Sequence, residues 1–171
     1  KMQDVIDSNS FDVVNLSVHD NGIYDYYEQK GFIREGIPKM LKTYFNNILD
    51  ALGNFSDFDV LSHFDFGFKT AYLLDNAVTI NTYEKEVRTI FKILIEKNKT
   101  LEINMKVENM IDHKHLNTIL DWYYEEGGKN ITLSSDSHNE ETYENYYQTR
   151  NEYINILKRH GFNKLSYFIK R

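Results

Sequence analysis

Residues 130–141 read NITLSSDSHNEE, and this stretch joins an apolar strand to polar side chains of a functional type. The run Ile131-Thr132-Leu133 is typical of a β-strand and leads directly into Ser-Asp-Ser-His. Because side chains two residues apart on a strand share a face, Asp136 and His138 can point in the same direction. A carboxylate and an imidazole are costly in an apolar core, whereas both are common metal ligands. We therefore interpret the end of this strand as a candidate metal site.

Strand-like and helix-like patterns alternate along the whole chain. The predicted strands are too apolar to have one face in water, which is typical of a parallel sheet or barrel covered by helices. A single proline, Pro38, and the absence of a Gly/Ser-rich linker predict one domain over residues 1–171. The predicted strands are 11–19, 58–63, 101–105, 131–138 and 164–170, and the predicted helices are 34–52, 82–97, 114–126 and 140–159. In the last helix we expect an inward face made of Tyr143, Tyr146, Tyr147, Ile154 and Leu157.

The composition limits the classes of function. Hydrophobic residues make up 41% and charged residues 27% of the 171 residues, as in ordinary globular proteins. The net charge of −6 does not favour binding along nucleic-acid phosphates, and no apolar run reaches the length of a membrane span. The absence of cysteine excludes a thiolate nucleophile, a thiolate metal ligand and a disulfide. No secretory signal opens the chain, so we expect a cytoplasmic protein.

Residues of metal-binding type recur at the ends of the predicted strands. His19 ends the first strand, His63 ends the second, and Asn104 falls late in the third. Asp136 and His138 end the fourth. In parallel α/β barrels the functional side chains gather at the carboxyl ends of the strands, so we expect these residues to meet at one rim. Carboxylate and imidazole without thiolate suit divalent zinc, manganese or iron.

Each of these residues also has a purely structural interpretation. A single histidine at a strand end is more often a hydrogen-bonded residue than a ligand, and Asp136 could serve only as an N-cap for the next helix. The agreement of several strand ends favours the metal-ligand interpretation. The pair His113 and His115 also looks like a metal motif, but it opens a predicted helix, where residues two apart point in different directions. We interpret this pair as a solvated helix start.

Five stretches of the chain match a known pattern. They are FDVVNLSVH (11–19), FDVLSHFDFGFK (58–69), LEINMK (101–106), YYEEGGKNITLSSDSH (123–138) and HGFNKLSYFIKR (160–171). The chain thereby resembles the C-terminal two-thirds of histidinol-phosphatases of the PHP (polymerase and histidinol phosphatase) superfamily. The most specific signature runs from a helix end through Gly-Gly and a strand into Ser-Asp-Ser-His. One departure is Ser62, which stands where the family has glycine.

The resemblance implies a distorted (β/α)7 TIM-like barrel of the PHP fold with a trinuclear centre of zinc, manganese or iron. Matched by position, His19, His63 and Asp136 correspond to ligands of two paired metals, and His138 corresponds to a ligand of the third. The family's other ligands precede the position that Lys1 matches, and such a barrel needs on the order of 250 residues. We therefore expect a partial PHP domain without its N-terminal strands, whose partner is the missing part of the same barrel.

The resemblance also implies an activity, the hydrolysis of L-histidinol phosphate to L-histidinol and phosphate in histidine biosynthesis. The expected partner is this small phosphate ester, and neither nucleic acid nor a membrane is expected. Lys69 follows His63-Phe64-Asp65 and is the expected phosphate contact, with an ordinary solvated lysine as the equal alternative. No catalytic role is assigned beyond the metal ligands. Two other functions stay open: hydrolysis of another small phosphate ester or nucleic-acid end, and a non-catalytic remnant that lacks half of the metal site.

Overall fold

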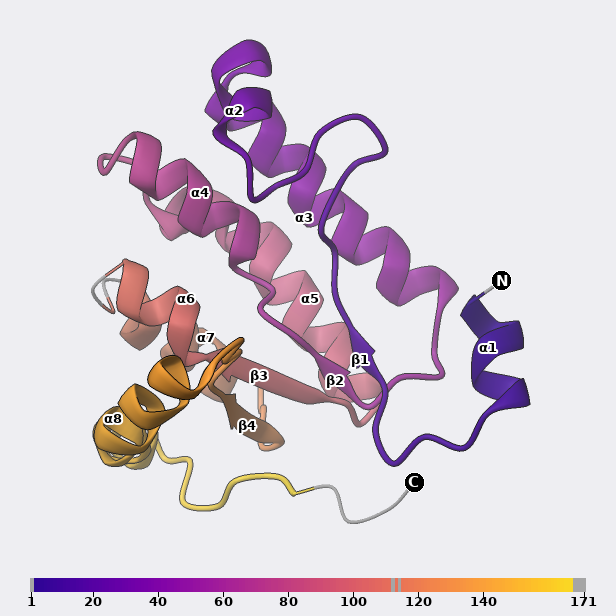
Figure 1. Cartoon of the computed structure of the whole chain (residues 1–171), viewed down its shortest axis with the longest axis vertical. Helices are drawn as coiled ribbons and strands as arrows, with labels where there is room; N and C mark the ends of the chain where they lie inside the picture. Colours follow the sequence, from indigo (N-terminus) through magenta and orange to yellow (C-terminus); the bar gives the residue numbers. More distant parts are fainter. Residues whose placement is uncertain (1, 112, 114, 168–171) are drawn as a thin grey trace.

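The computed structural model describes residues 2–111, 113 and 115–167 and shows an α/β fold built on a four-stranded parallel sheet (Figure 1). The α/β class predicted from the alternating pattern is confirmed. The strands lie across the sheet in the order of the sequence, and each neighbouring pair is parallel. They are β1 (Asn15–Leu16), β2 (Val60–Leu61), β3 (Thr100–Asn104) and β4 (Ile131–Ser134). Because all four run the same way, their carboxyl ends meet at one edge of the sheet.

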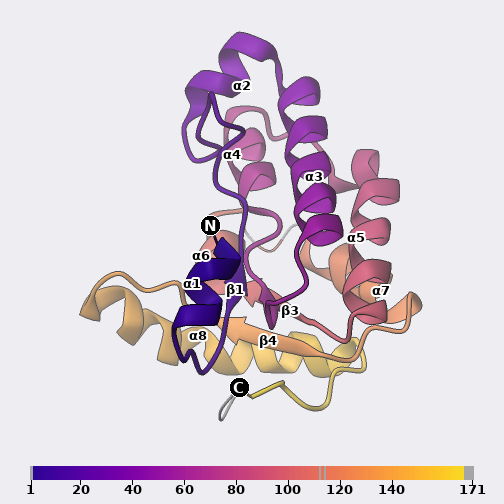
Figure 2. The same ribbon diagram turned by 90° about the vertical axis from the view of Figure 1, so that its right-hand side faces the viewer.

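Helices form the connections that parallel strands require. Figure 1 shows α3, α4 and α5 side by side, and Figure 2 shows α8 running along β4. The helices are α1 (Met2–Ser8), α2 (Gln29–Glu35), α3 (Ile37–Asn54), α4 (Phe66–Leu74), the 3-10 helix η1 (Ile80–Tyr83), α5 (Glu84–Glu96), α6 (Met105–Met110), α7 (Leu116–Glu125) and α8 (Glu140–Arg159). Of the helices that the structure describes, none combines the length and low charge needed to cross a bilayer.

Aromatic side chains pack the helices together. The ring of Phe64, just after β2, lies 5.4 Å from Phe91 of α5, which in turn lies 5.1 Å from Tyr123 of α7. All three side chains are buried, and the ring pairs are edge to face, a geometry that contributes about 0.5–1.5 kcal/mol per pair beyond area burial. This packing fixes the chain that follows β2, which carries His63, relative to α5 and α7.

The strands are shorter than the sequence predicts. The predicted strand 11–19 pairs only at Asn15–Leu16, and the predicted strand 131–138 ends at Ser134. The polar residues that follow each strand leave the hydrogen-bonded ladder and form loops at the edge of the sheet. In the predicted strand 164–170, residues 164–167 are not in a strand, although Ser166 N donates a hydrogen bond to Ile131 O at 2.7 Å. Residues 168–170 lie outside the described residues.

Helices α2, α4 and α6 were not predicted, and the inward face of α8 was predicted correctly only in part. Every residue from Phe66 to Ala71 in α4 is buried, so the helix lacks the polar face that would show its period, and α6 has only six residues. Tyr143 and Tyr147 are exposed, against the prediction, whereas Leu157 is buried as predicted and Tyr146 and Ile154 are partly buried. The second half of α8 also buries Tyr153 and Ile156.

The sheet is open over the residues that the structure describes, with β1 and β4 at its two edges. Four parallel strands joined by helical crossovers agree with a segment of a (β/α) barrel. Closure into the seven-stranded PHP barrel, the absence of N-terminal strands and the assignment of residues 1–171 to one partial domain stay predictions.

Candidate active site

The ends of β1 and β2 bring two predicted ligands together. The imidazole rings of His19 and His63 lie 4.9 Å apart, centroid to centroid, and both contact the ring of Phe66. The parallel pairing of Leu16 with Leu61 sets the two chains side by side just before these residues. The sequence prediction that these histidines share one rim is therefore confirmed.

His63 combines an unpaired ring nitrogen with a strained backbone. Its Nδ1 is buried and has no hydrogen-bond partner among the described residues, a state that calls for an explanation such as a bound ion. Burial lowers the pKa of His63, and the adjacent His19 lowers it further, so the neutral imidazole that metals bind is favoured. The backbone of His63 has a left-handed φ of 29°, which costs a non-glycine residue about 1–3 kcal/mol.

The loop after β4 carries Asp136 and His138. Asp136 also has a left-handed backbone, with φ 48°, and its N–H donates to Ser134 Oγ at 3.2 Å. His138 Nδ1 lies 2.7 Å from the backbone carbonyl oxygen of Asp136. A carbonyl oxygen only accepts, so Nδ1 carries the proton and the lone pair of the ring lies on Nε2. Hydrogen bonding of one ring nitrogen to a carbonyl is the usual way that a protein orients a metal-binding histidine.

Glu102 of β3 holds the backbone of His63 in place. Its carboxylate accepts hydrogen bonds from Ser62 Oγ (3.1 Å), His63 N (3.2 Å) and Asn104 Nδ2 (3.2 Å). Burial raises the pKa of Glu102, and the three hydrogen bonds oppose that rise. The sequence analysis did not single out Glu102. The available signal was its position two residues before Asn104 in a fully buried strand, which puts both side chains on one face.

A second pair of buried carboxyl groups lies beside the site. Asp65 and Glu108 are 4% and 1% exposed, and their side chains share a hydrogen bond. Two adjacent carboxyl groups can form this bond only when one is protonated. Burial raises the pKa of both groups, and the charge of Asp65 raises the pKa of Glu108 further, so Glu108 holds the shared proton.

Lys69 of α4 is buried, so the prediction of a solvated lysine is wrong. Only 3% of the residue is exposed, and its ammonium lies 4.4 Å from the ring centroid of Phe66 and 4.8 Å from that of Tyr27. Cation–π contacts of this kind strengthen when water is excluded. Burial lowers the pKa of Lys69, and the charge of Lys106 lowers it further. The expected phosphate contact of Lys69 stays a prediction.

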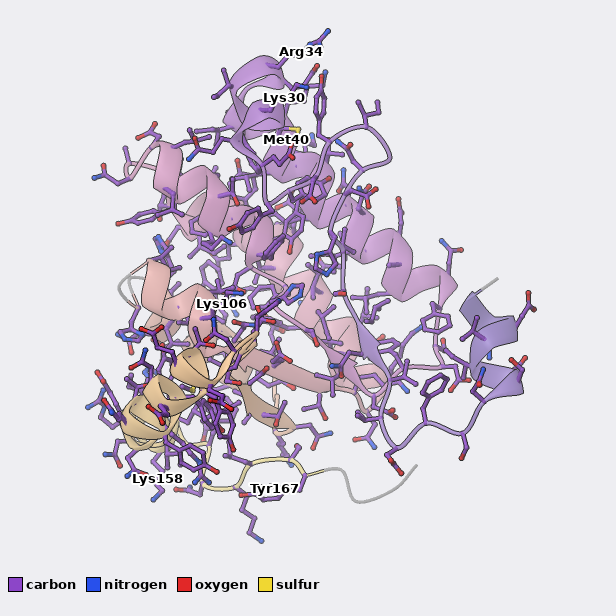
Figure 3. The ribbon with its side chains drawn as sticks, in the orientation of Figure 1. Lys30, Arg34, Met40, Lys106, Lys158 and Tyr167 are labelled. Carbon is purple, nitrogen blue, oxygen red and sulfur yellow. The ribbon has the colours of Figure 1, made fainter. Side chains whose placement is uncertain are left out.

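Lys106 is a residue that the sequence analysis missed. It lies in the first turn of α6 (Figure 3). Its Nζ is 3.5 Å from Asp136 Oδ2 and 3.3 Å from His138 Nδ1. The sequence feature that could have indicated Lys106 is its position two residues after the end of β3, where a barrel places functional side chains.

The four predicted ligands are not gathered into one complete site. His19 and His63 are adjacent, and Asp136 lies near enough to His63 to influence its pKa. However, within the described ranges there is no group of three or more His, Cys, Asp or Glu side chains that could hold a metal ion. Asp136 is turned toward Lys106, and His138 is 70% exposed at its side chain. The site therefore contains side chains of metal-binding type in a partial arrangement.

The second histidine pair is not a solvated helix start. His115 is 4% exposed, and its ring lies edge-on to Phe68 at 4.8 Å and to Tyr72 at 5.6 Å. His113 packs against the ring of Tyr153 at 4.9 Å. The two side chains turn to different aromatic neighbours, as residues two apart near a helix start are expected to do.

Two known proteins similar to this chain are named as a histidinol-phosphatase and a probable histidinol-phosphatase. No protein-family model matches the chain. It is 27% identical over 166 residues to the histidinol-phosphatase of Lactococcus lactis, an alignment that covers 95% of this chain and 60% of that protein. It is 28% identical over 133 residues to a probable histidinol-phosphatase of Clostridium acetobutylicum, covering 77% of this chain and 52% of that protein. The chain resembles histidinol-phosphatases. The resemblance predicted from the sequence is thus confirmed.

A solved structure shares the fold. The crystal structure of histidinol phosphate phosphatase from Lactococcus lactis, complexed with zinc, L-histidinol and phosphate, superimposes with a TM-score of 0.82 at 24% sequence identity. The match covers 98% of this chain and 63% of the solved chain. The chain thus spans about 60% of the length of the histidinol-phosphatase of Lactococcus lactis.

Proposed function

We propose that the protein is a metal-dependent phosphomonoesterase that hydrolyses L-histidinol phosphate to L-histidinol and phosphate. The observation that carries this proposal is the convergence of His19 and His63 at adjacent strand ends, with Asp136 close by, on a fold shared with a histidinol phosphate phosphatase. That neighbour is complexed with zinc, L-histidinol and phosphate, which supports the same metal and substrate class here. A role in histidine biosynthesis follows if this substrate is correct.

The residues that would hold metal are His19, His63, Asp136 and His138. The buried Nδ1 of His63 without a partner, and the Nδ1–H of His138 that leaves its Nε2 lone pair for a ligand, both fit this role. A trinuclear centre of zinc, manganese or iron needs more ligands than these four, and we propose that other parts of the protein supply them. When bound, such metals supply Lewis-acid activation of water and neutralise charge on phosphate.

The remaining side chains would orient the substrate and the ligands. Lys69 would meet the phosphate group as a positive charge, since its ammonium is sequestered from water by Phe66 and Tyr27. Electrostatic attraction is stronger in such a water-poor environment. Glu102 would act as a positioning residue, because it fixes the backbone of His63 rather than reaching the reaction itself.

The proposal is tested by measuring phosphate release from L-histidinol phosphate. The protein is purified as its gene encodes it, treated with chelator, and assayed with and without added zinc or manganese. We expect turnover that depends on metal and that exceeds the turnover of other small phosphate esters. Absence of metal-dependent turnover on any phosphate ester would overturn the proposal in favour of a non-catalytic role. A higher kcat/KM for a different ester would keep the reaction class and change the substrate.

A further inference from the structure

The loop between β1 and α2 contains Asn21 followed by Gly22, and no other asparagine of the sequence precedes a glycine. The loop folds back on itself, since Tyr26 N donates a hydrogen bond to His19 O at 2.8 Å. The Asn-Gly pair lies in the turn where the chain reverses direction. Gly22 is exposed and Asn21 is half-buried, so water reaches this pair. Exposed turns of this kind are where chemical changes to a folded chain concentrate.

The side-chain carbonyl of Asn21 is polarised by the turn. Its Oδ1 accepts hydrogen bonds from Ile23 N at 3.0 Å and from Tyr24 N at 2.8 Å. Two backbone N–H groups that meet one carbonyl oxygen stabilise the negative charge that forms on it when a nucleophile attacks its carbon. The turn therefore makes Cγ of Asn21 a better electrophile than the same carbon in a side chain that contacts only water.

The backbone nitrogen of Gly22 is an unhindered nucleophile for this carbon. A Cβ built at Gly22 would meet no atom of other parts of the described chain within 4 Å, so the space around the residue is open. Its φ of 82° is a left-handed conformation that glycine adopts without strain. Gly22 N donates to Asp20 Oδ1 at 2.8 Å, which holds the peptide group in one orientation. Attack on Asn21 Cγ is intramolecular, so it avoids the entropic cost of bringing two molecules together.

We propose that Asn21 is a site of spontaneous deamidation in the folded protein, independently of the proposed phosphatase function. The nitrogen of Gly22 bonds to Cγ of Asn21, and its proton passes to water. The bond from Cγ to the side-chain nitrogen breaks, and this nitrogen takes a proton from water and leaves as ammonia. Water then opens the resulting succinimide ring at either carbonyl, which gives aspartate or isoaspartate without any oxidation or reduction. The loop gains a negative charge two residues after the candidate ligand His19.

The competing effect of the same hydrogen bonds is protection of Asn21. A side chain held away from Gly22 N cannot close the ring, whereas an unfolded chain samples the reactive geometry freely. The test therefore incubates the protein as its gene encodes it, native and unfolded in urea, at the same mildly alkaline pH. Peptide mass mapping follows the conversion of amide to acid. The controls are the variant Asn21→Gln and, within the same chain, Asn98, which is exposed and has a left-handed backbone (φ 51°) but precedes Lys99.

We expect Asn21 in the native protein to convert faster than in the unfolded chain, or at a rate no more than about tenfold below it. Asn98 should convert more slowly in both states, because the side chain of Lys99 crowds the attacking nitrogen. Asn21→Gln should keep its amide, because attack there must close a larger ring. A native rate more than about tenfold below the unfolded rate would overturn the inference and show that the fold protects Asn21. Equal conversion at Asn98 or in Asn21→Gln would also overturn it, since the Asn-Gly turn would then not direct the reaction.

Discussion

Replacing Glu102 with alanine is expected to weaken both the fold and metal binding. The carboxylate is 6% exposed and accepts hydrogen bonds at 3.1–3.2 Å from Ser62, His63 and Asn104. Alanine leaves these donors without their acceptor. A hydrogen bond to a charged group contributes about 1.5–3 kcal/mol, but the three bonds share one carboxylate whose burial opposes them. We therefore expect Glu102→Ala to lower the free energy of unfolding by about 3–5 kcal/mol.

The assay pairs urea unfolding with zinc titration, and Glu102→Gln is the control. Glutamine keeps an acceptor oxygen of the same reach, so its loss in unfolding free energy should be about 1–2 kcal/mol. Because Glu102 positions His63, zinc affinity should fall about 10- to 100-fold in the alanine variant. A Glu102→Ala protein within about 1 kcal/mol of the wild type would show that these hydrogen bonds make no net contribution. Reduced stability with unchanged zinc affinity would remove the positioning role.

Three other tests concern the ligands, the buried lysine and the buried acid pair. Asp136→Asn and His63→Ala should each lower bound metal in elemental analysis, and full metal content in both would assign them structural roles. Lys69→Ala should lower kcat/KM for L-histidinol phosphate about ten- to hundredfold, mainly through KM and without loss of metal; a wild-type value would contradict the phosphate contact. Burial raises the pKa of Glu108 well above its ordinary value of 4.5, so the folded state binds more protons than the unfolded state, and stability falls as pH rises above that value. Glu108→Gln should remove this loss, so its unfolding free energy relative to the wild type should rise with pH by up to about 1.4 kcal/mol per unit in urea curves, and a pH-independent difference would refute the assignment.

The positions of the candidate ligands could be predicted from the sequence because they depend on strand ends. An apolar run that stops at His63, or at Ser-Asp-Ser-His, marks the point where a parallel strand reaches the edge of its sheet. Each such stop is a local feature and needs no knowledge of distant residues. The adjacency of His19 and His63 then follows from parallel pairing of their strands.

The supporting residues could not be predicted in the same way, because their roles depend on contacts between distant segments. Glu102 matters through its hydrogen bond to a backbone N–H 39 residues earlier in the chain. The burial of Lys69 was not predicted, because no residue pattern near it in the sequence shows that the rings of Tyr27 and Phe66 enclose its ammonium. Lys106 meets its partners only because α6 starts where β3 ends.

The left-handed backbones of His63 and Asp136 bear on any attempt to engineer a more heat-resistant version of this protein. A common strategy replaces non-glycine residues at positive φ with glycine, which removes about 1–3 kcal/mol of backbone strain at each position. At these two positions that change would delete the imidazole and the carboxylate on which metal binding is proposed to depend. At Asn98, which has φ 51° and lies at the turn before β3, the same change removes a 3.0 Å hydrogen bond from Asn130 Nδ2 but no candidate ligand. At His63 and Asp136, a change that raises thermal stability would thus remove a proposed metal ligand. At Asn98, the backbone strain can be relieved without that loss.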